Sequence, residues 1–190
     1  YAQVKKALAK VRWCEFSGIE PNPRYETLMR AVKLVRQKKI TFLLAVGGGS
    51  VVDGTKFIAA AARFPGEPWD ILAKQAPLAS AVPFGVVLTL PATGTEMNAG
   101  SVVSREETRE KLFFVNPVVF PKFSILDPTT TYSLPESQVV NGIVDSFVHT
   151  TEQYLTRPSG AYFQDRQAEA ILNTLADIAP TLLDDSSDYD

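Results

Sequence analysis

The stretch Ile40–Pro65 constrains the fold of this chain more than any other part of its sequence. It begins with an apolar run, Thr41–Val46, of the kind that a parallel strand buried on both faces requires. Three glycines follow, and Ser50 then opens a segment of small apolar residues that continues to Ala62. This order of strand, glycine turn and helix predicts an anion site, because the first N–H groups of a helix are unpaired and its dipole favours negative charge.

The turn Gly47–Gly49 has the residue types that a phosphate site needs, although it matches neither of two familiar phosphate motifs. A glycine lacks the Cβ that would keep a phosphate from close approach, and Ser50 can both cap the helix and offer its hydroxyl. The fingerprint G-x-G-x-x-G is not met, because Val52 stands where its last glycine should be. A P-loop is rejected, because Thr55–Lys56 stands where Lys-Ser/Thr should. A glycine turn that binds no ligand is the alternative.

Length and composition restrict the class of protein. The 190 residues suit one domain, or one domain with part of another, and the 45% apolar and 21% charged residues are ordinary for a soluble globular protein. A net charge of −2 without a basic cluster argues against nucleic acid as a partner. No apolar run has the length needed to cross a bilayer, which argues against a membrane protein.

The single cysteine, Cys14, falls in a predicted strand, Val11–Phe16. We interpret it as a buried thiol in a reducing, cytoplasmic setting. A catalytic Cys14 would need a base, and the only histidine, His149, lies far away in the sequence.

The order of elements predicts an open α/β sheet. A helix over Tyr1–Lys10 precedes the strand Val11–Phe16, and two prolines and an asparagine make Gly18–Pro23 a loop. Apolar residues at helical spacing predict a further helix over Tyr25–Lys38, directly before the glycine stretch. Helices and strands that alternate in this way are typical of a parallel sheet with right-handed crossovers.

A second candidate loop follows the apolar strand Phe84–Leu90, after a connection that holds a short helix around Trp69–Leu72. The segment Pro91–Glu96 is rich in hydroxyls and lies at the carboxyl end of its strand, where ligands bind in open α/β sheets. Ordinary turn chemistry is the alternative for Thr93 and Thr95.

Beyond this loop the sequence predicts a hairpin and one irregular strand. The hairpin strands are Val102–Ser104 and Leu112–Val115, and Lys111 at their return is either a functional cation or a solvated surface charge. Val118–Leu126 is a further strand candidate, which Pro121 makes irregular.

From about Pro135 the pattern changes from strands to helices. Proline in a first turn favours a helix start, so we predict one helix through Gln138–Leu155. A second helix, Tyr162–Leu183, is expected to end or bend at Pro180. We therefore predict an α/β domain over residues 1–134 and the beginning of a helical domain over residues 135–190.

Asp145 and His149 form a candidate half of a metal site. They are four residues apart, so on a helix they share one face, and a carboxylate with an imidazole suits Zn²⁺ or Fe²⁺. Two ligands do not complete a site, and the chain has no second histidine. A hydrogen bond that stabilises the helix is the alternative role for the pair.

Four runs of the sequence resemble the iron-containing (group III) alcohol dehydrogenases, with most similarity to the butanol dehydrogenase and NADPH-dependent aldehyde reductase branch. They are Phe16–Pro23, Ala45–Lys56, Leu88–Asn98 and Val139–Tyr154, in the order of the family. The resemblance implies a Rossmann-like parallel-sheet cofactor domain, followed by the start of an all-helical metal-binding domain, in a dehydroquinate synthase-like fold.

The resemblance also implies roles for individual residues. Asp145 and His149 match the first two of four metal ligands and would act in catalysis through that metal. The residues that match the family's contacts to NAD or NADP are Gly48, Gly49, Ser50 and Asp53 at the pyrophosphate, Thr89 and Thr93 along the cofactor, Asn98 near the reaction site, Lys111 near the nicotinamide ribose, and Thr130 and Leu134 in the cofactor cleft.

The chain departs from the family pattern at both ends. The remaining two ligands of the family are histidines on later helices, and the family's first strand would precede Tyr1. We therefore expect a fragment that lacks a complete metal site and is not a competent enzyme by itself. The resemblance further implies a homodimer in the parent protein.

Two functions follow from these observations. The first is part of a metal-dependent, NAD(P)-linked alcohol dehydrogenase or aldehyde reductase, which acts on a small alcohol or aldehyde. The alternative is a non-catalytic nucleotide-binding or assembly module of the same fold. A phosphate-sugar or kinase-type enzyme rests on the glycine turn alone. The sequence leaves open the substrate, NAD versus NADP, and iron versus zinc.

Overall fold

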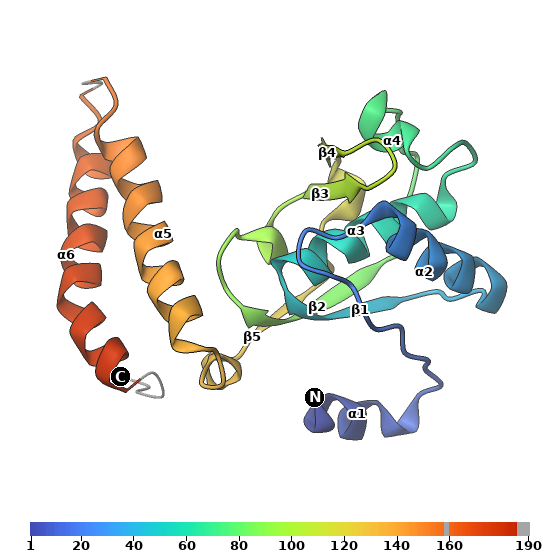
Figure 1. Cartoon of the computed structure of the whole chain (residues 1–190), viewed down its shortest axis with the longest axis horizontal. Coiled ribbons are helices and arrows are strands. Elements are labelled where there is room, and N and C mark those ends of the chain that lie inside the picture. The colour runs from blue at the N-terminus through green and yellow to red at the C-terminus, as the bar shows by residue number, and fades with distance from the viewer. Residues whose placement is uncertain (158–159, 186–190) are drawn as a thin grey trace. The chain divides into compact units, whose positions relative to one another are not determined.

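The computed structural model describes residues 1–157 and 160–185, which form two compact units (Figure 1). The first unit comprises residues 1–89 and 93–126, and the second comprises residues 90–92 and the chain from Asp127 onward. These units are defined by packing alone, so a functional division near residue 134 stays a prediction.

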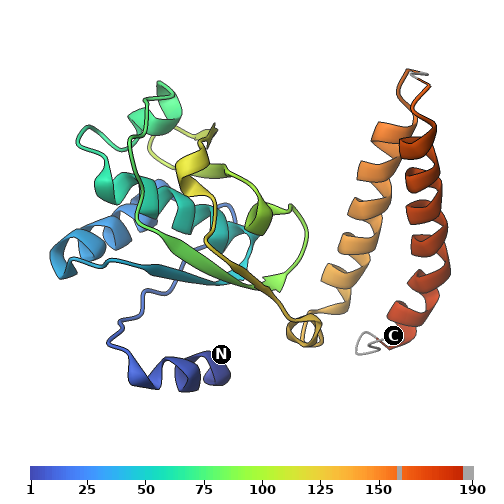
Figure 2. The ribbon, with the colours of Figure 1, turned by 180° about the vertical axis from the view of Figure 1, so that it is seen from behind.

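The first unit is built on a three-stranded sheet in the order β1-β2-β5. Its strands are β1 (Leu43–Gly48), β2 (Phe84–Leu90) and the short β5 (Ser124–Leu126). β2 and β5 run parallel, with Val86 opposite Ser124. α2 (Tyr25–Lys38) and α3 (Gly49–Arg63) lie on the same side of this sheet, as both ribbon views show (Figures 1 and 2). The α/β class with a parallel sheet is thereby confirmed.

α3 is the central helix of this unit. It packs against β1 on one side and against the hairpin of β3 (Gly100–Arg105) and β4 (Glu110–Val115) on another. The small side chains of its second half let these neighbours approach, and every residue from Gly54 to Ala61 is buried. β3 and β4 are antiparallel, which confirms the predicted hairpin.

Arg36 of α2 closes the end of α3. Its guanidinium donates hydrogen bonds to the carbonyls of Ala61 at 2.6 Å, Phe64 at 3.0 Å and Ala62 at 3.2 Å. These carbonyls lie in the last turn of α3 and just beyond it, where the regular N–H partners of a helix run out, although the Ala61 carbonyl also accepts a 3.2 Å hydrogen bond from the N–H of Phe64. The predicted helix over Tyr25–Lys38 is confirmed and thus also terminates its neighbour.

The prediction of a strand over Val11–Phe16 is wrong. α1 (Ala2–Ala7) and a 3₁₀ turn (Leu8–Lys10) confirm the helical start, but the described residues that follow are extended without forming a strand. A groove of about 1150 Å³ separates this segment from β1, so its backbone has no ladder partner. The prediction of a buried thiol is wrong for the same reason, because Cys14 is exposed.

Shorter elements differ in extent from their predictions. The short helix around Trp69–Leu72 is present as α4 (Asp70–Ala73). The strand expected over Val118–Leu126 is reduced to β5, because a 3₁₀ turn at Pro117–Val119 is capped by the Asn116 side chain, which accepts a hydrogen bond from the N–H of Val118.

The second unit is a helical hairpin of α5 (Glu136–Tyr154) and α6 (Tyr162–Asp184), which lie side by side in Figures 1 and 2. A 3₁₀ turn (Pro128–Thr131) precedes α5. The helix through Gln138–Leu155 is confirmed up to Tyr154, and α6 continues past Pro180, so the expected end there is wrong. Within the described residues of α5 and α6, none is buried.

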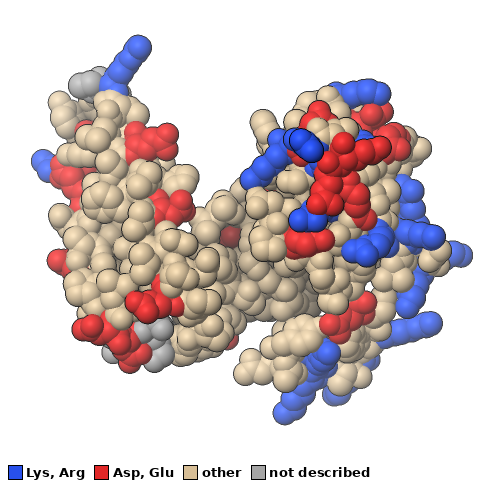
Figure 3. Space-filling model, viewed as in Figure 1, with Lys and Arg blue, Asp and Glu red and all other residues tan. Residues whose placement is uncertain are grey.

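Charged side chains are mixed in sign on the face of the first unit shown in Figure 3, where acidic groups lie among the lysines and arginines. Among residues 1–157 and 160–185, no helix combines the length and apolar character that crossing a bilayer requires.

Two matched glycine substitutions test the packing of α3. A Cβ at Gly54 would lie 2.8 Å from Cδ2 of Leu28, which is fully buried, whereas nothing lies within 4 Å of a Cβ at Gly142 in α5. We expect Gly54→Ala to destabilise the first unit by about 1–2 kcal/mol, because overpacking outweighs the helix preference of alanine. Gly142→Ala should instead stabilise its helix by up to about 1 kcal/mol.

Each effect has its own probe, since both tryptophans, Trp13 and Trp69, belong to the first unit. Urea unfolding followed by tryptophan fluorescence reports on Gly54→Ala, and far-ultraviolet circular dichroism reports on Gly142→Ala. Equal effects of the two substitutions would contradict the close packing of α3.

Candidate cofactor site

Two loops meet at the carboxyl ends of the neighbouring strands β1 and β2. The first is the turn Gly47–Gly49, and the second contains Thr93. A Cβ built on Gly49 would lie 3.1 Å from Oγ1 of Thr93, so the threonine side chain faces the glycine turn. The structure therefore brings these two predicted site residues together, at the end of the sheet where ligands bind in open α/β folds.

The glycines of this turn are needed because there is no room for a side chain, and not because of unusual backbone angles. Gly48 is the N-cap of α3 with φ −84° and ψ −171°, an extended conformation open to any residue. At Gly47 a Cβ would lie 2.7 Å from Cγ2 of Val51, so the turn can pass the helix only without a side chain. Because the turn carries no side chains, none of them covers the first N–H groups of α3. A phosphate site requires such accessible N–H groups.

Ser50 does not cap the helix, contrary to expectation. α3 begins at Gly49, so Ser50 lies within the first turn, and no side-chain capping bond forms. Its Oγ instead accepts a hydrogen bond of 3.2 Å from the N–H of Asn22. Because Oγ is the acceptor in that bond, the hydroxyl proton of Ser50 can still be donated to an anion.

Asn22 connects Ser50 to Lys111. Asn22 has the left-handed φ of 55°, which asparagine tolerates better than most residues, and its Oδ1 accepts a 2.8 Å hydrogen bond from Nζ of Lys111. Lys111 is exposed on β4 yet held beside the loop before α2, which is more than a freely solvated charge. Sequence reasoning assigned no role to Asn22; the signal was an asparagine between two prolines.

Asp53 and Lys56 face the interior of the first unit. One carboxylate oxygen of Asp53 accepts a hydrogen bond from the Thr95 hydroxyl, and the other accepts one of 2.9 Å from the N–H of Val102. Nζ of Lys56, which is 0% exposed, donates to Thr95 Oγ1 at 2.8 Å, to Asn98 Oδ1 at 2.8 Å and to the carbonyl of Gly100 at 2.7 Å.

Burial lowers the pKa of the Lys56 ammonium to about 8, against the opposing effect of the Asp53 and Glu96 carboxylates. Sequence reasoning used Lys56 only to reject a P-loop. The missed signal was its position, because Lys56 lies four residues after Val52, and three and four residues before Ala59 and Ala60, on a buried face of α3.

The other predicted cofactor residues are spread over both units. Thr89 lies half-buried near the end of β2, and Asn98 Oδ1 also accepts a 2.9 Å hydrogen bond from the N–H of Gly100. Thr130 and Leu134 belong to the second unit, where the Thr130 hydroxyl donates to the carbonyl of Asp127 at 2.8 Å. Roles for these residues at a cofactor stay predictions.

Asp145 and His149 share one face of α5, with 3.5 Å between Oδ1 and Nε2. Both side chains are at least half exposed, and a carboxylate oxygen with an imidazole nitrogen fits two positions of an iron or zinc site. Within the described part of the chain, no group of three or more His, Cys, Asp and Glu side chains could hold a metal ion. The donors present thus fit half of a metal centre.

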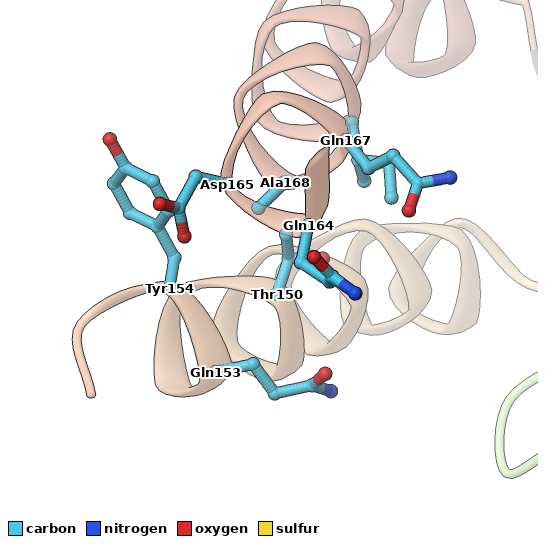
Figure 4. A pocket seen from close by; sticks show the side chains of 8 residues that line it. Thr150, Gln153, Tyr154, Gln164, Asp165, Gln167 and Ala168 are labelled. Atoms are coloured by element: carbon cyan, nitrogen blue, oxygen red, sulfur yellow. The ribbon is translucent and has the colours of Figure 1, made fainter. Parts of the chain in front are cut away.

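A small pocket of about 240 Å³ lies between α5 and α6 (Figure 4). Gln153 and Tyr154 of α5 face Gln164 and Asp165 of α6 around it. Neither Asp145 nor His149 lines this pocket, so the pocket is not part of the candidate metal site.

Comparison with known proteins identifies the family. The family model described as "iron-containing alcohol dehydrogenase" matches residues 1–128, and the chain belongs to this family. It is 58% identical to the NADPH-dependent aldehyde reductase YqhD of Escherichia coli (strain K12) over 99% of this chain and 49% of the relative. It is 48% identical to the probable NADH-dependent butanol dehydrogenase 1 of Bacillus subtilis (strain 168), over 99% of this chain and 48% of the relative.

A solved structure agrees with this assignment. The NADH-dependent butanol dehydrogenase A of Thermotoga maritima matches all of this chain with a TM-score of 0.90 at 37% identity, over 48% of its own length. The resemblance and the fold class inferred from the sequence are both confirmed. The chain spans about half the length of the curated relatives it matches.

The depressed pKa of Lys56 makes the stability of the first unit depend on pH. The native chain holds this proton less tightly than an exposed lysine, whose pKa is 10.5, so deprotonation favours the native state. The contribution of Lys56 to stability should therefore rise between pH 8 and 10.5 and be constant below that window. At about pH 9.5 the gain should be on the order of 1–2 kcal/mol.

The measurement is urea unfolding of the parent chain and of Lys56→Met at about pH 7 and about pH 9.5, followed by tryptophan fluorescence. The difference between the two proteins should grow in favour of the parent at the higher pH. A difference independent of pH would show that Lys56 is not buried as a charged group.

Proposed function

We propose that this chain provides the nicotinamide-cofactor site and half of the metal ligands of an alcohol dehydrogenase or aldehyde reductase that depends on NAD(P) and a metal. One observation carries the proposal: the glycine turn and the loop with Thr93 face each other at the ends of β1 and β2, beside the N-terminus of α3. The names of the relatives, which are aldehyde reductases and butanol dehydrogenases, support the reaction class.

The residues of the chain would bind the cofactor through its phosphates. The N–H groups at the start of α3 and the hydroxyl of Ser50 supply donors to the phosphates. Lys111, which is expected near the nicotinamide ribose, is held beside Ser50 by its hydrogen bond to Asn22. Thr93 approaches the same turn from the opposite loop.

The reaction itself would use groups that the complete protein binds. When present, the nicotinamide carries the hydride and the metal polarises the carbonyl of the aldehyde as a Lewis acid. Asp145 and His149 would hold that metal, and their separation of one helical turn orients both toward one point.

Further features belong to the same proposal. Iron is supported by the name of the family, and zinc is the other metal that this donor pair suits. A homodimer is supported by the resemblance alone, and a cytoplasmic location by the single, unpaired cysteine. The relatives include both NADPH- and NADH-dependent proteins, so the two cofactors are tested side by side.

Gly48→Val tests the cofactor site. The extended backbone of Gly48 suits valine, so we expect folding to persist while the side chain obstructs the phosphate position. Titration of the chain with NADPH and with NADH should give dissociation constants at least about tenfold higher than those of the parent, a loss of about 1.4 kcal/mol.

Gly142→Val is the matched control, because its side chain would enter open space on α5. Cofactor affinity should be unaffected by it. Equal affinities of Gly48→Val and the parent would place the phosphates elsewhere, and a parent that binds neither nucleotide would refute the proposed cofactor site.

The metal pair is tested by dialysis against zinc or ferrous iron. We expect weak, exchangeable binding to the parent chain, since two protein ligands fall short of the three that catalytic sites normally use. His149→Ala and Asp145→Ala should each lower the amount of bound metal to background. Asp177→Ala, which removes a carboxylate from α6, is the control and should bind as much metal as the parent.

Cofactor binding should be unchanged in all three variants. Retention of the metal by His149→Ala would assign the ligands to other residues.

A further inference from the structure

We propose that Lys56 is a positioning residue, which anchors the segment Thr93–Gly100 to α3 and thereby holds Thr93 opposite the glycine turn. Only one part of this inference, the effect of Lys56 on cofactor binding, rests on the proposed cofactor site. The anchoring itself can be tested without any cofactor.

The geometry of Lys56 matches an internal anchor. A lysine ammonium has three N–H groups, and each finds one acceptor at 2.7–2.8 Å: Thr95 Oγ1, Asn98 Oδ1 and the Gly100 carbonyl. All three acceptors lie within six consecutive residues of one segment. All three N–H groups of the Lys56 ammonium are therefore hydrogen-bonded to this segment, and the side chain has no exposure to solvent.

The anchored segment has little regular structure of its own. Between β2 and β3 it contains a single 3₁₀ turn, Thr95–Met97, with a backbone hydrogen bond of 3.0 Å from the N–H of Met97 to the carbonyl of Gly94. The carbonyl of Ala99 accepts a further backbone hydrogen bond of 3.1 Å from the N–H of Asn116. Side chains add more: the Ser124 hydroxyl donates to the carbonyl of Glu96 at 2.7 Å, and Lys56 supplies its three bonds. Such a segment depends on these bonds for a fixed position.

Asp53 balances the charge of the anchor. The Thr95 hydroxyl accepts a hydrogen bond from Lys56 and donates one to Asp53, so it links the ammonium to a carboxylate. The Ser101 hydroxyl donates to the Asp53 carbonyl at 2.8 Å, and the Val102 N–H binds its carboxylate, which extends the same connection into β3. We therefore assign Asp53 to this anchor rather than to the pyrophosphate.

The anchor acts on the cofactor site through the chain. Lys56 is seven residues beyond Gly49, about two helical turns, and its ammonium is enclosed, so it does not reach a phosphate at the start of α3. Thr93, however, is only two residues before Thr95. Holding Thr95 and Asn98 against α3 therefore also holds Thr93 in position beside Gly49. The Oγ1 atom of Thr93 would lie 3.1 Å from a Cβ built on Gly49.

Four variants separate anchoring from general stability. Lys56→Met keeps the length of the side chain and removes its donors, and Thr95→Val removes the linking hydroxyl at nearly constant volume. Thr95→Ser keeps that hydroxyl and is the conservative rescue. Thr55→Val is the matched control, because it removes a buried hydroxyl of the same helix whose bond, 2.8 Å to the Val51 carbonyl, stays within α3.

The first measurement is amide hydrogen exchange of the 190-residue chain at neutral pH, read by mass spectrometry. We expect Lys56→Met and Thr95→Val to speed exchange in residues 93–100 at least about tenfold relative to the parent, with α2 unchanged. Thr95→Ser and Thr55→Val should exchange like the parent. If Lys56→Met does not fold, the comparison of Thr95→Val with Thr95→Ser decides.

The second measurement is the dissociation constant of NADPH, which should rise about tenfold in Lys56→Met and Thr95→Val and not in the other two. Exchange of residues 93–100 that is unchanged in Thr95→Val, or raised equally in Thr55→Val, would overturn the anchor. Faster exchange with unaltered NADPH affinity would overturn its role in positioning Thr93. A parent that binds neither NADPH nor NADH would refute the proposed function, and the exchange data would still decide the anchor; a parent that binds only NADH moves the affinity comparison to NADH.

Discussion

The enclosure of α3 is the constraint on which the first unit depends. Its second half is surrounded by β1, α2 and the β3–β4 hairpin, and every residue from Gly54 to Ala61 is buried there. The helix therefore begins and ends at fixed places: the turn Gly47–Gly49 sets its start, and the guanidinium of Arg36 takes up the carbonyls at its end. The proposed phosphate site at the N-terminus of α3 requires a helix that keeps its position, and close packing of this kind favours such a fixed position.

One charged residue among these buried side chains, Lys56, connects the packing of α3 to the candidate cofactor site. An ammonium in an apolar environment is costly unless all its donors are paired, and Lys56 meets that condition by drawing on the loop that follows β2. The same bonds that make its burial tolerable bring the second loop to the first. The candidate site is thus assembled from two distant stretches of sequence by an interaction beneath it.

The sequence was informative where a local pattern determines structure by itself. The helical spacing of Tyr25–Lys38 and the strand–turn–helix pattern around Gly48 predicted their elements closely. The family runs added the choice of site residues, of which Gly49 and Thr93 do come together, as does Lys111 with the loop beside Ser50.

The failures concern partners that a local pattern does not contain. The alternation in Val11–Phe16 is typical of a strand, yet a strand exists only beside another, and a groove separates this segment from β1. Asn22 and Lys56 were missed because their roles lie in contacts to residues 28 to 89 positions away. Ser50 was expected to cap α3, but the glycine before it already starts the helix.

The helical hairpin of α5 and α6 has a different kind of stability from the rest of the chain. None of its described helical residues is buried, so the two helices lack an enclosed core, whereas packing of a helix face supplies most of the stability of helices in proteins. The α/β unit has a continuous core, with Leu28, Phe57 and Val86 at 0% exposure. We therefore expect this chain to unfold in two transitions, the first of which removes part of the helical signal while the environment of Trp69 is still intact, so that no single melting temperature describes the molecule.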